Sequence, residues 1–210
     1  MRTPRAAGIA GVIFSFLYSS SLLLVWVSIP DNPLGPATAV INHLKTLSFS
    51  LRLLSFAGIA FLWFIAVVRD RIGQLEDRFF ATVFLGSGLL FIAMVFNAAA
   101  AAGGLIRLLG SGSENLIRSG AYALGRAEIT ETMQIYATKM AGVFMITTST
   151  MSLRTRILPR WMAILGYLLA LVLLLSVGTI EWIPLVFPLW VLLISVHILT
   201  QNLGQSNVAA

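Results

Sequence analysis

Long stretches almost without charge alternate with short charged segments along the whole chain. The stretches that carry at most one charged side chain are residues 6–30, 46–68, 79–106, 132–153, 161–180 and 182–210. A bilayer core about 30 Å thick is crossed by about 20 apolar residues in an α-helix. The pattern therefore predicts an all-α, polytopic transmembrane helix bundle that forms one domain over residues 1–210. The six spanning helices are expected near residues 7–29, 48–68, 79–102, 132–153, 161–178 and 183–201.

The composition agrees with lipid as the main solvent of this chain. Only 10% of its residues are charged and its mean hydropathy is +0.92, whereas soluble domains carry about 25% charged residues. There are no cysteines, which excludes disulfides, thiolate metal sites, iron–sulfur clusters and a cysteine nucleophile. The net charge of +6 does not indicate nucleic-acid binding, because the basic residues stand at the ends of apolar segments and form no tract.

The basic residues also predict an orientation. One side of the predicted membrane holds Arg2, Arg5, Arg69, Arg71, Arg78, Arg154, Arg156 and Arg160. The other side holds Lys45, Arg107, Arg118 and Arg126. Because cytoplasmic loops carry the excess of Lys and Arg, the first side is expected inside, with both termini in the cytoplasm. The first apolar segment exceeds the 7–15 residues typical of a signal peptide, so we expect it to remain as a helix.

The two outer loops are expected to be longer than the cytoplasmic ones. Residues 30–36 are rich in proline and other turn formers, and apolar residues then recur at helical spacing up to Leu47. This pattern predicts a short interfacial helix, and a second one is expected over residues 116–124. Such loops either anchor the bundle at the interface or act as lids.

Lys139 is the first candidate for a functional residue. It lies about two turns, or roughly 10 Å, inside the fourth predicted helix, where a cation costs about 2.5–3.5 kcal/mol and by default indicates function. Asn97 falls in the outer half of the third predicted helix and Tyr136 near the outer end of the fourth. Glu131 and Glu128 lie two and three turns further outward, on about the same helical face as Lys139. Together these residues are a candidate lining for an outward-facing polar cavity. The alternative is that Lys139 extends to the outer interface and pairs with Glu131 or Glu128.

Other basic residues are candidates for contacts with lipid or ligand. Arg52 lies one turn inside the second predicted helix, where it either reaches the interface or joins Lys139 in a basic pocket for an anionic group. Arg154, Arg156 and Arg160 lie on the inner side and suit anionic lipid head groups. Topology alone also places arginines there.

The sequence shows no catalytic or metal-binding pattern and no sign of a cofactor. It has no His, Asp and Glu cluster at metal-ligand spacing, no G-x-S-x-G turn and no phosphate-binding loop. His43 and His197 are expected near opposite membrane faces, so they do not form one site. We therefore expect a protein that is not an enzyme, with membrane lipids and other membrane subunits as its partners.

Three blocks of the chain carry a resemblance to a known family. They are FLWFIAVVRDRIGQLEDRFFATVFLGSGLLFIAM (61–94), KMAGVFMITTSTMSLRT (139–155) and LPRWMAILGYLLALVLLL (158–175). The chain resembles an uncharacterised family of small six-helix bacterial membrane proteins, mostly from actinobacteria. The resemblance implies a bacterial plasma membrane and six helices, but it implies no activity and no role for any residue.

Three functions remain open at this point. The leading hypothesis is binding or transport of a small molecule, ion or lipid through a polar cavity in the outer half of the bundle. The second is an accessory or structural subunit of a larger membrane complex, which predicts a small-residue or aromatic face that the bundle leaves uncovered. The third is a lipid-modifying enzyme, which requires Glu128, Glu131 and Lys139 to surround a cleft that lipid can reach.

Overall fold

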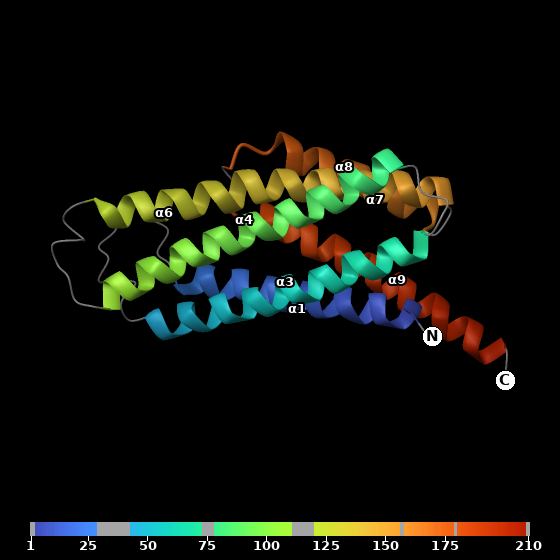
Figure 1. The fold of residues 1–210 in the computed structure, drawn as a ribbon, viewed down its shortest axis with the longest axis horizontal. Helices are drawn as coiled ribbons and strands as arrows, with labels where there is room; N and C mark the ends of the chain where they lie inside the picture. The colour runs from blue at the N-terminus through green and yellow to red at the C-terminus, as the bar shows by residue number, and fades with distance from the viewer. Residues whose placement is uncertain are drawn as a thin grey trace.

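Every regular element in the described part of the chain is a helix (Figure 1). The computed structural model describes residues 3–28, 43–72, 78–110, 120–155, 158–178 and 180–208, with side chains for 8–28, 43–69, 78–110, 120–155, 158–178 and 180–201. Its helices are α1 (Thr3–Ser28), α3 (Leu44–Ile72), α4 (Arg78–Gly110), α6 (Ala121–Glu131), α7 (Thr138–Thr155), α8 (Arg160–Leu175) and α9 (Val186–Val208). The π-helix η2 (Thr132–Ala137) joins α6 to α7, and the 3₁₀ turn η3 (Ile183–Leu185) precedes α9. Because α6, η2 and α7 form one rod, the described residues contain the six predicted helices.

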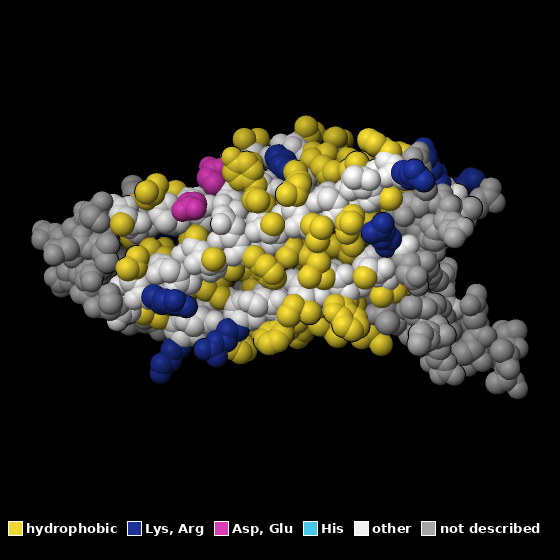
Figure 2. All heavy atoms as spheres, viewed as in Figure 1, with side chains coloured by type: hydrophobic (Ala, Val, Ile, Leu, Met, Phe, Trp, Pro, Cys, Tyr) yellow, Lys and Arg dark blue, Asp and Glu magenta, His cyan; other side chains and the backbone are white. Residues whose placement is uncertain are grey.

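Four of these helices are long and apolar enough to cross a membrane. They contain the segments Gly8–Ser28, Leu44–Arg69, Arg78–Gly110 and Ile183–Gln201. α8 is apolar, but its 16 residues reach only about 24 Å at 1.5 Å per residue, which is less than the bilayer core. α7 is rich in buried hydroxyl side chains, so it is long but less apolar. Hydrophobic side chains cover the middle of the face in Figure 2, and most Lys and Arg side chains lie towards its two ends.

Two helices extend at least eight residues further at one end than the hydropathy pattern predicts. α4 has 33 residues, about 50 Å, and ends at Gly110 instead of residue 102. Residues 121–124, predicted to belong to a separate interfacial helix, begin the rod that continues to Thr155. Hydropathy marks only the part of a helix that lipid surrounds, whereas strong helix formers such as Leu105, Leu108 and Leu109 allow α4 to continue past the glycines at 103 and 104. The other predicted interfacial helix lies mostly in residues 29–42, outside the described ranges.

The helices pack in the order α8, α7, α4, α3, α1, α9. α1 packs along α3 and α9, α3 along α4, α4 along the α6–η2–α7 rod, and α7 along α8. α9 also touches α7 and α8, which closes the ring over part of its length. The end of the bundle where α1 stops and α3 starts is called the Trp26 end below, and the opposite end is called the Arg154 end.

Five phenylalanine rings fill the centre of this ring of helices. This aromatic cluster consists of Phe14, Phe61, Phe91, Phe144 and Phe187, one each from α1, α3, α4, α7 and α9, all at most 2% exposed. Phe61 contacts the other four, with ring centroids 4.6 to 5.4 Å apart. Aromatic pairs at this spacing stabilise a core beyond the area they bury. The cluster therefore closes the middle of the bundle with side chains.

Gly11 is required for the close contact of α1 with α9 and α3. A Cβ atom there would overlap Ser195 Oγ and lie 2.8 Å from the ring of Phe64. We expect Gly11→Ala to lower the free energy of unfolding by about 1–3 kcal/mol, as overpacking commonly does. The matched control is Gly86→Ala, because a Cβ atom at Gly86 meets nothing within 4 Å. Thermal unfolding of both variants in one detergent measures the difference, and equal transition temperatures would contradict this account.

Candidate ligand-binding cavity

A cavity of about 670 Å³ lies inside the half of the bundle towards the Trp26 end. Its size falls within the range of about 300–1,000 Å³ that small-molecule sites occupy. On each of α1, α3 and α4 the lining begins seven residues from the aromatic cluster, at Ser21, Leu54 and Ala98. Seven residues are about two helical turns. The aromatic cluster therefore packs the bundle about two turns below the cavity and does not itself line it.

The walls that α1, α3 and α4 contribute are almost entirely apolar. They include Leu22, Val25, Leu51, Leu54, Ala102 and Leu105. Ser21 also lines the cavity, but its hydroxyl donates to the carbonyl oxygen of Ser50 at 2.9 Å, so α1 and α3 satisfy it. An apolar body is therefore the part of a ligand that these three helices would contact.

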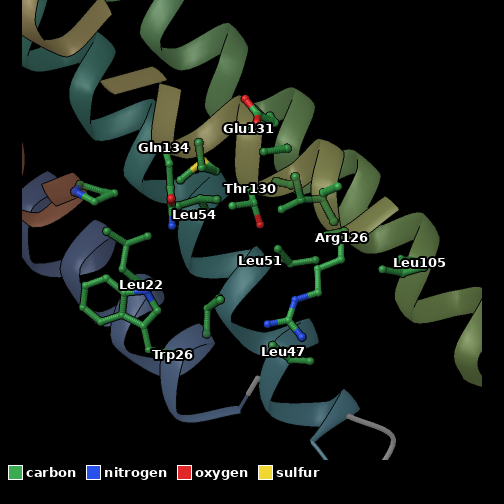
Figure 3. A pocket seen from close by; sticks show the side chains of 18 of the residues that line it. Leu22, Trp26, Leu47, Leu51, Leu54, Leu105, Arg126, Thr130, Glu131 and Gln134 are labelled. Atoms are coloured by element: carbon green, nitrogen blue, oxygen red, sulfur yellow. The ribbon is translucent and has the colours of Figure 1, made fainter. Parts of the chain in front are cut away.

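The polar side chains of the cavity come mainly from one face of the α6–η2 rod. Tyr122, Arg126, Thr130 and Gln134 recur every four residues and all line the cavity. Side chains four residues apart lie on the same face of a helix. Figure 3 shows Arg126 directed towards Leu47 and Leu51 of α3, with Thr130 and Gln134 following along the same face. We refer to these four residues as the polar stripe.

The π-helix η2 lies where the polar stripe ends. Its extended turn is visible in the hydroxyl of Thr138, which donates to the carbonyl oxygen of Met133, five residues earlier, at 3.0 Å. One extra residue in a turn rotates the following helix by about 100° relative to an uninterrupted one. The predicted shared face of Glu131 and Lys139 holds only for a regular α-helix. Because η2 rotates α7 relative to α6, the spacing of these two residues no longer places them on one face.

Lys139 is a helix cap in this structure. Its ammonium group donates hydrogen bonds to the backbone carbonyl oxygens of Leu173 (3.3 Å), Leu174 and Ser176. The last carbonyl groups of a helix have no partner within the helix, and a cation at this end also interacts favourably with the helix dipole. Lys139 therefore ends α8, the helix that is too short to reach across a bilayer core, and it is not among the residues that line the cavity.

The other predicted cavity residues are not brought together. Asn97, Tyr136 and Arg52 are exposed on the outside of the bundle and are not part of the cavity lining. Glu131 does line the cavity at its edge, where its side chain is exposed and its carboxylate points away from Arg126 (Figure 3). Glu128 is exposed and does not line the cavity. Of the predicted set, only Glu131 borders the cavity.

Two of the three predicted head-group arginines, Arg154 and Arg160, lie at the Arg154 end. Arg154 is exposed and sits over the ring of Phe80, 4.5 Å from its centroid, which is a cation–π contact. Arg160 is exposed at the first residue of α8, and Arg156 lies outside the described residues. Neither His43 nor His197 lines the cavity. Within the described ranges, no group of three or more His, Cys, Asp or Glu side chains is placed to hold a metal ion.

Sequence reasoning missed the polar stripe. Its signal was present, because Tyr122, Arg126, Thr130 and Gln134 stand at a constant spacing of four residues. Residues 103–131 are so much less apolar than the spans that the sequence predicts a loop there with a short interfacial helix over 116–124, and not one helical face that continues from Tyr122 to Gln134. A periodic polar face inside a weakly apolar segment would have identified it.

Comparisons with protein-family models, with curated proteins and with solved structures found no match to this chain. The resemblance noted in the sequence therefore stays a prediction. The case for function depends on the geometry of the cavity alone.

Proposed function

We propose that this chain is an integral membrane protein that binds a largely apolar small molecule in the cavity at the Trp26 end. The observation that supports this proposal is the cavity itself, which has apolar walls on three sides and one polar stripe. Sites for small molecules commonly combine apolar walls with a few placed polar groups. The aromatic cluster supports binding and retention over conduction through an open pore, because closely packed rings fill the middle of the bundle beyond the cavity.

We also propose six membrane spans, with the Trp26 end on the outer side of a bacterial plasma membrane. The excess of arginine at the Arg154 end supports this orientation through the positive-inside rule. In this arrangement α8 spans the bilayer with the help of Lys139, whose hydrogen bonds satisfy the helix end that stops within the apolar zone. Cysteine accessibility from each side of intact cells tests the orientation, and the cysteine-free chain provides a clean background.

Filling the cavity tests the proposed function. Ala102 lines the cavity, whereas Ala100, two residues earlier on α4, is exposed on the outside. We expect Ala102→Trp to abolish binding of a neutral single-chain lipid, monopalmitoylglycerol, because an indole occupies the space of the ligand. We expect Ala100→Trp to bind as the native protein does.

Native mass spectrometry of the detergent-extracted variants, titrated with the lipid, measures this difference. Unfolding temperatures measured in parallel show that both variants are folded. If the native protein binds no monopalmitoylglycerol, or if the two variants bind it equally well, the cavity is not the binding site.

One observation keeps the accessory-subunit hypothesis as a second candidate. Ala93, Asn97, Ala100 and Gly104 are exposed along one face of α4, and a Cβ atom at Gly104 would meet nothing within 4 Å. Small residues allow membrane helices to approach closely, and an amide bonds across such a contact. This uncovered small-residue face is the sign that the hypothesis predicts. The accessory-subunit hypothesis would be favoured if a stoichiometric partner co-purifies with the native chain and is released by Asn97→Leu. A chain that is monomeric in mild detergent would contradict it.

The lipid-modifying enzyme has no comparable support. That hypothesis requires Glu128, Glu131 and Lys139 around one cleft, but the described residues place Lys139 against the end of α8 and leave Glu128 outside the cavity lining.

A further inference from the structure

Packed side chains lie beyond the cavity at one end of the bundle axis and border it at the other. The aromatic cluster lies about two turns below the cavity. Towards the Trp26 end, Leu47 of α3, Leu109 of α4 and Tyr122 of α6 form a second buried cluster, against which Val25 of α1 also packs. We call this second group the outer cluster. A ligand that reaches the polar stripe along the bundle axis would have to pass one of these two packed groups.

Among the described residues, α1 and α6 border the cavity without packing extensively on each other. α1 packs along α3 and α9, and α6 packs along α4, but the described residues show no extended packing of α1 on α6. α9 fills this position only from Val186 onwards, towards the Arg154 end. Beyond its start, the connection from α8 to α9 contributes Gly178, Glu181 and Pro184 to the lining. The gap between α1 and α6, bordered by this connection, is called the side opening.

The surface around the side opening is apolar. Val177, Ile180 and Trp182 of the connection are 77%, 55% and 64% exposed, and Val27 of α1 is 82% exposed. The rings of Trp26 and Trp182 contact each other, with centroids 4.7 Å apart. Tryptophan is enriched at the membrane–water interface. In a bilayer this surface would therefore face lipid near the head-group level, and the side opening would lead from the leaflet into the cavity.

Arg126 is the charge that a ligand would meet inside the cavity. It is partly buried, and its guanidinium lies beside Leu47 and Leu51 (Figure 3). Glu131 and Glu181 also border the cavity, but both side chains are exposed at its edge. Arg126 takes part in an interaction within the chain. Because a guanidinium has five N–H donors, it can bind a further acceptor as well.

We propose that the ligand is a membrane lipid with at least one acyl chain and an anionic head group, a carboxylate or a phosphate. This inference rests on the proposed function and adds the chemistry of the ligand and its route. The head group would bind Arg126, because a guanidinium matches the planar spacing of these anions. Tyr122 and Thr130 stand one turn to either side as further donors. The chain would lie against the leucines of α1 and α3 and reach the leaflet through the side opening.

Two lipids with the same palmitoyl chain separate the head-group claim from cavity binding. Lysophosphatidate carries a phosphate, and monopalmitoylglycerol is neutral. We expect Arg126→Gln to weaken lysophosphatidate binding by about tenfold or more, the effect of losing a charge-assisted hydrogen bond. Binding of monopalmitoylglycerol should change by less than about twofold. Arg107→Gln is the matched control, because Arg107 is an exposed arginine of α4 towards the same end and lies outside the lining.

The titrations use native mass spectrometry with the intact chain, and the unfolding temperature of each empty variant shows that it is folded. If Arg126→Gln weakens binding of both lipids equally, or of neither, the proposal of an anionic head group is wrong, while the proposed function stands. If Ala102→Trp binds monopalmitoylglycerol as well as Ala100→Trp does, the proposed function itself is wrong.

The source of the anion is tested with water-soluble competitors. If glycerol 3-phosphate or inorganic phosphate displaces lysophosphatidate at equal concentration, the site recognises an aqueous anion and the lipid proposal is wrong. The expected result is no displacement.

A lysophosphatidate with a diazirine at the end of its chain, incorporated into vesicles with the protein, tests the position of the chain. Cross-links should concentrate on the cavity walls near Leu22 and Leu54 and disappear in Ala102→Trp. Cross-links confined to exposed residues such as Leu168 and Leu171 would show only annular lipid and overturn the proposal.

Discussion

Replacing Phe61 by alanine should lower the free energy of unfolding by about 3–5 kcal/mol, the range found for Phe→Ala in packed cores. Phe61 is fully buried and contacts the rings of four other helices. In a membrane, helices associate through packing and not through exclusion of water, so a void at this point removes contacts that lipid cannot replace. A steep fall in the unfolding temperature in detergent is the expected measurement.

Phe56→Ala is the matched control for this prediction. Phe56 lies on α3, as Phe61 does, but its side chain is 62% exposed. It should change the unfolding temperature little, because detergent or lipid already surrounds its ring. If both variants unfold at the same temperature, the aromatic cluster is not the main packing contact of the bundle.

Replacing Lys139 by methionine should lower the free energy of unfolding by about 2–3 kcal/mol and leave lipid binding in the cavity intact. The substitution leaves the carbonyl oxygens of Leu173, Leu174 and Ser176 without their donor. A buried polar group that loses its partner costs about 1–3 kcal/mol, and the interaction of the cation with the helix end is lost as well. Thermal unfolding and monopalmitoylglycerol titration of one preparation give both results.

Lys139→Arg is the corresponding control, because arginine keeps the charge and the donors and should recover much of the stability. The opposite result, full stability of Lys139→Met with loss of ligand, would instead assign Lys139 to the binding site, as the sequence hypothesis does.

The number of helices followed from the sequence because charge and hydropathy report directly on the length of chain that lipid surrounds. The ends of the helices were harder to predict from charge and hydropathy. α4 continues to Gly110 and the α6–η2–α7 rod begins at Ala121, since a helix needs no apolar surface once it leaves the membrane. An element that extends beyond the bilayer is therefore shortened by any prediction based on hydropathy.

The site was harder to predict, for two physical reasons. Lys139 was singled out because a cation inside an apolar segment needs a partner, but that partner is the backbone of α8, which has no signature in the sequence. The π-helix η2 shifts the register between Glu131 and Lys139, and a helical projection with a constant period does not contain that shift. The polar stripe was visible as a four-residue spacing, but most of its segment is predicted as a loop with a short interfacial helix.

The aromatic cluster also sets the order in which the bundle can be completed during synthesis. Its rings come from positions 14 to 187, so more than 170 residues separate the first ring from the last. At about 5–20 residues per second, Phe14 waits roughly 9–35 s for Phe187 to emerge. During that time the earlier helices are in the membrane with their central faces unfilled. Insertion of α9, which also packs along α1, is therefore the step that converts a set of inserted helices into a closed bundle.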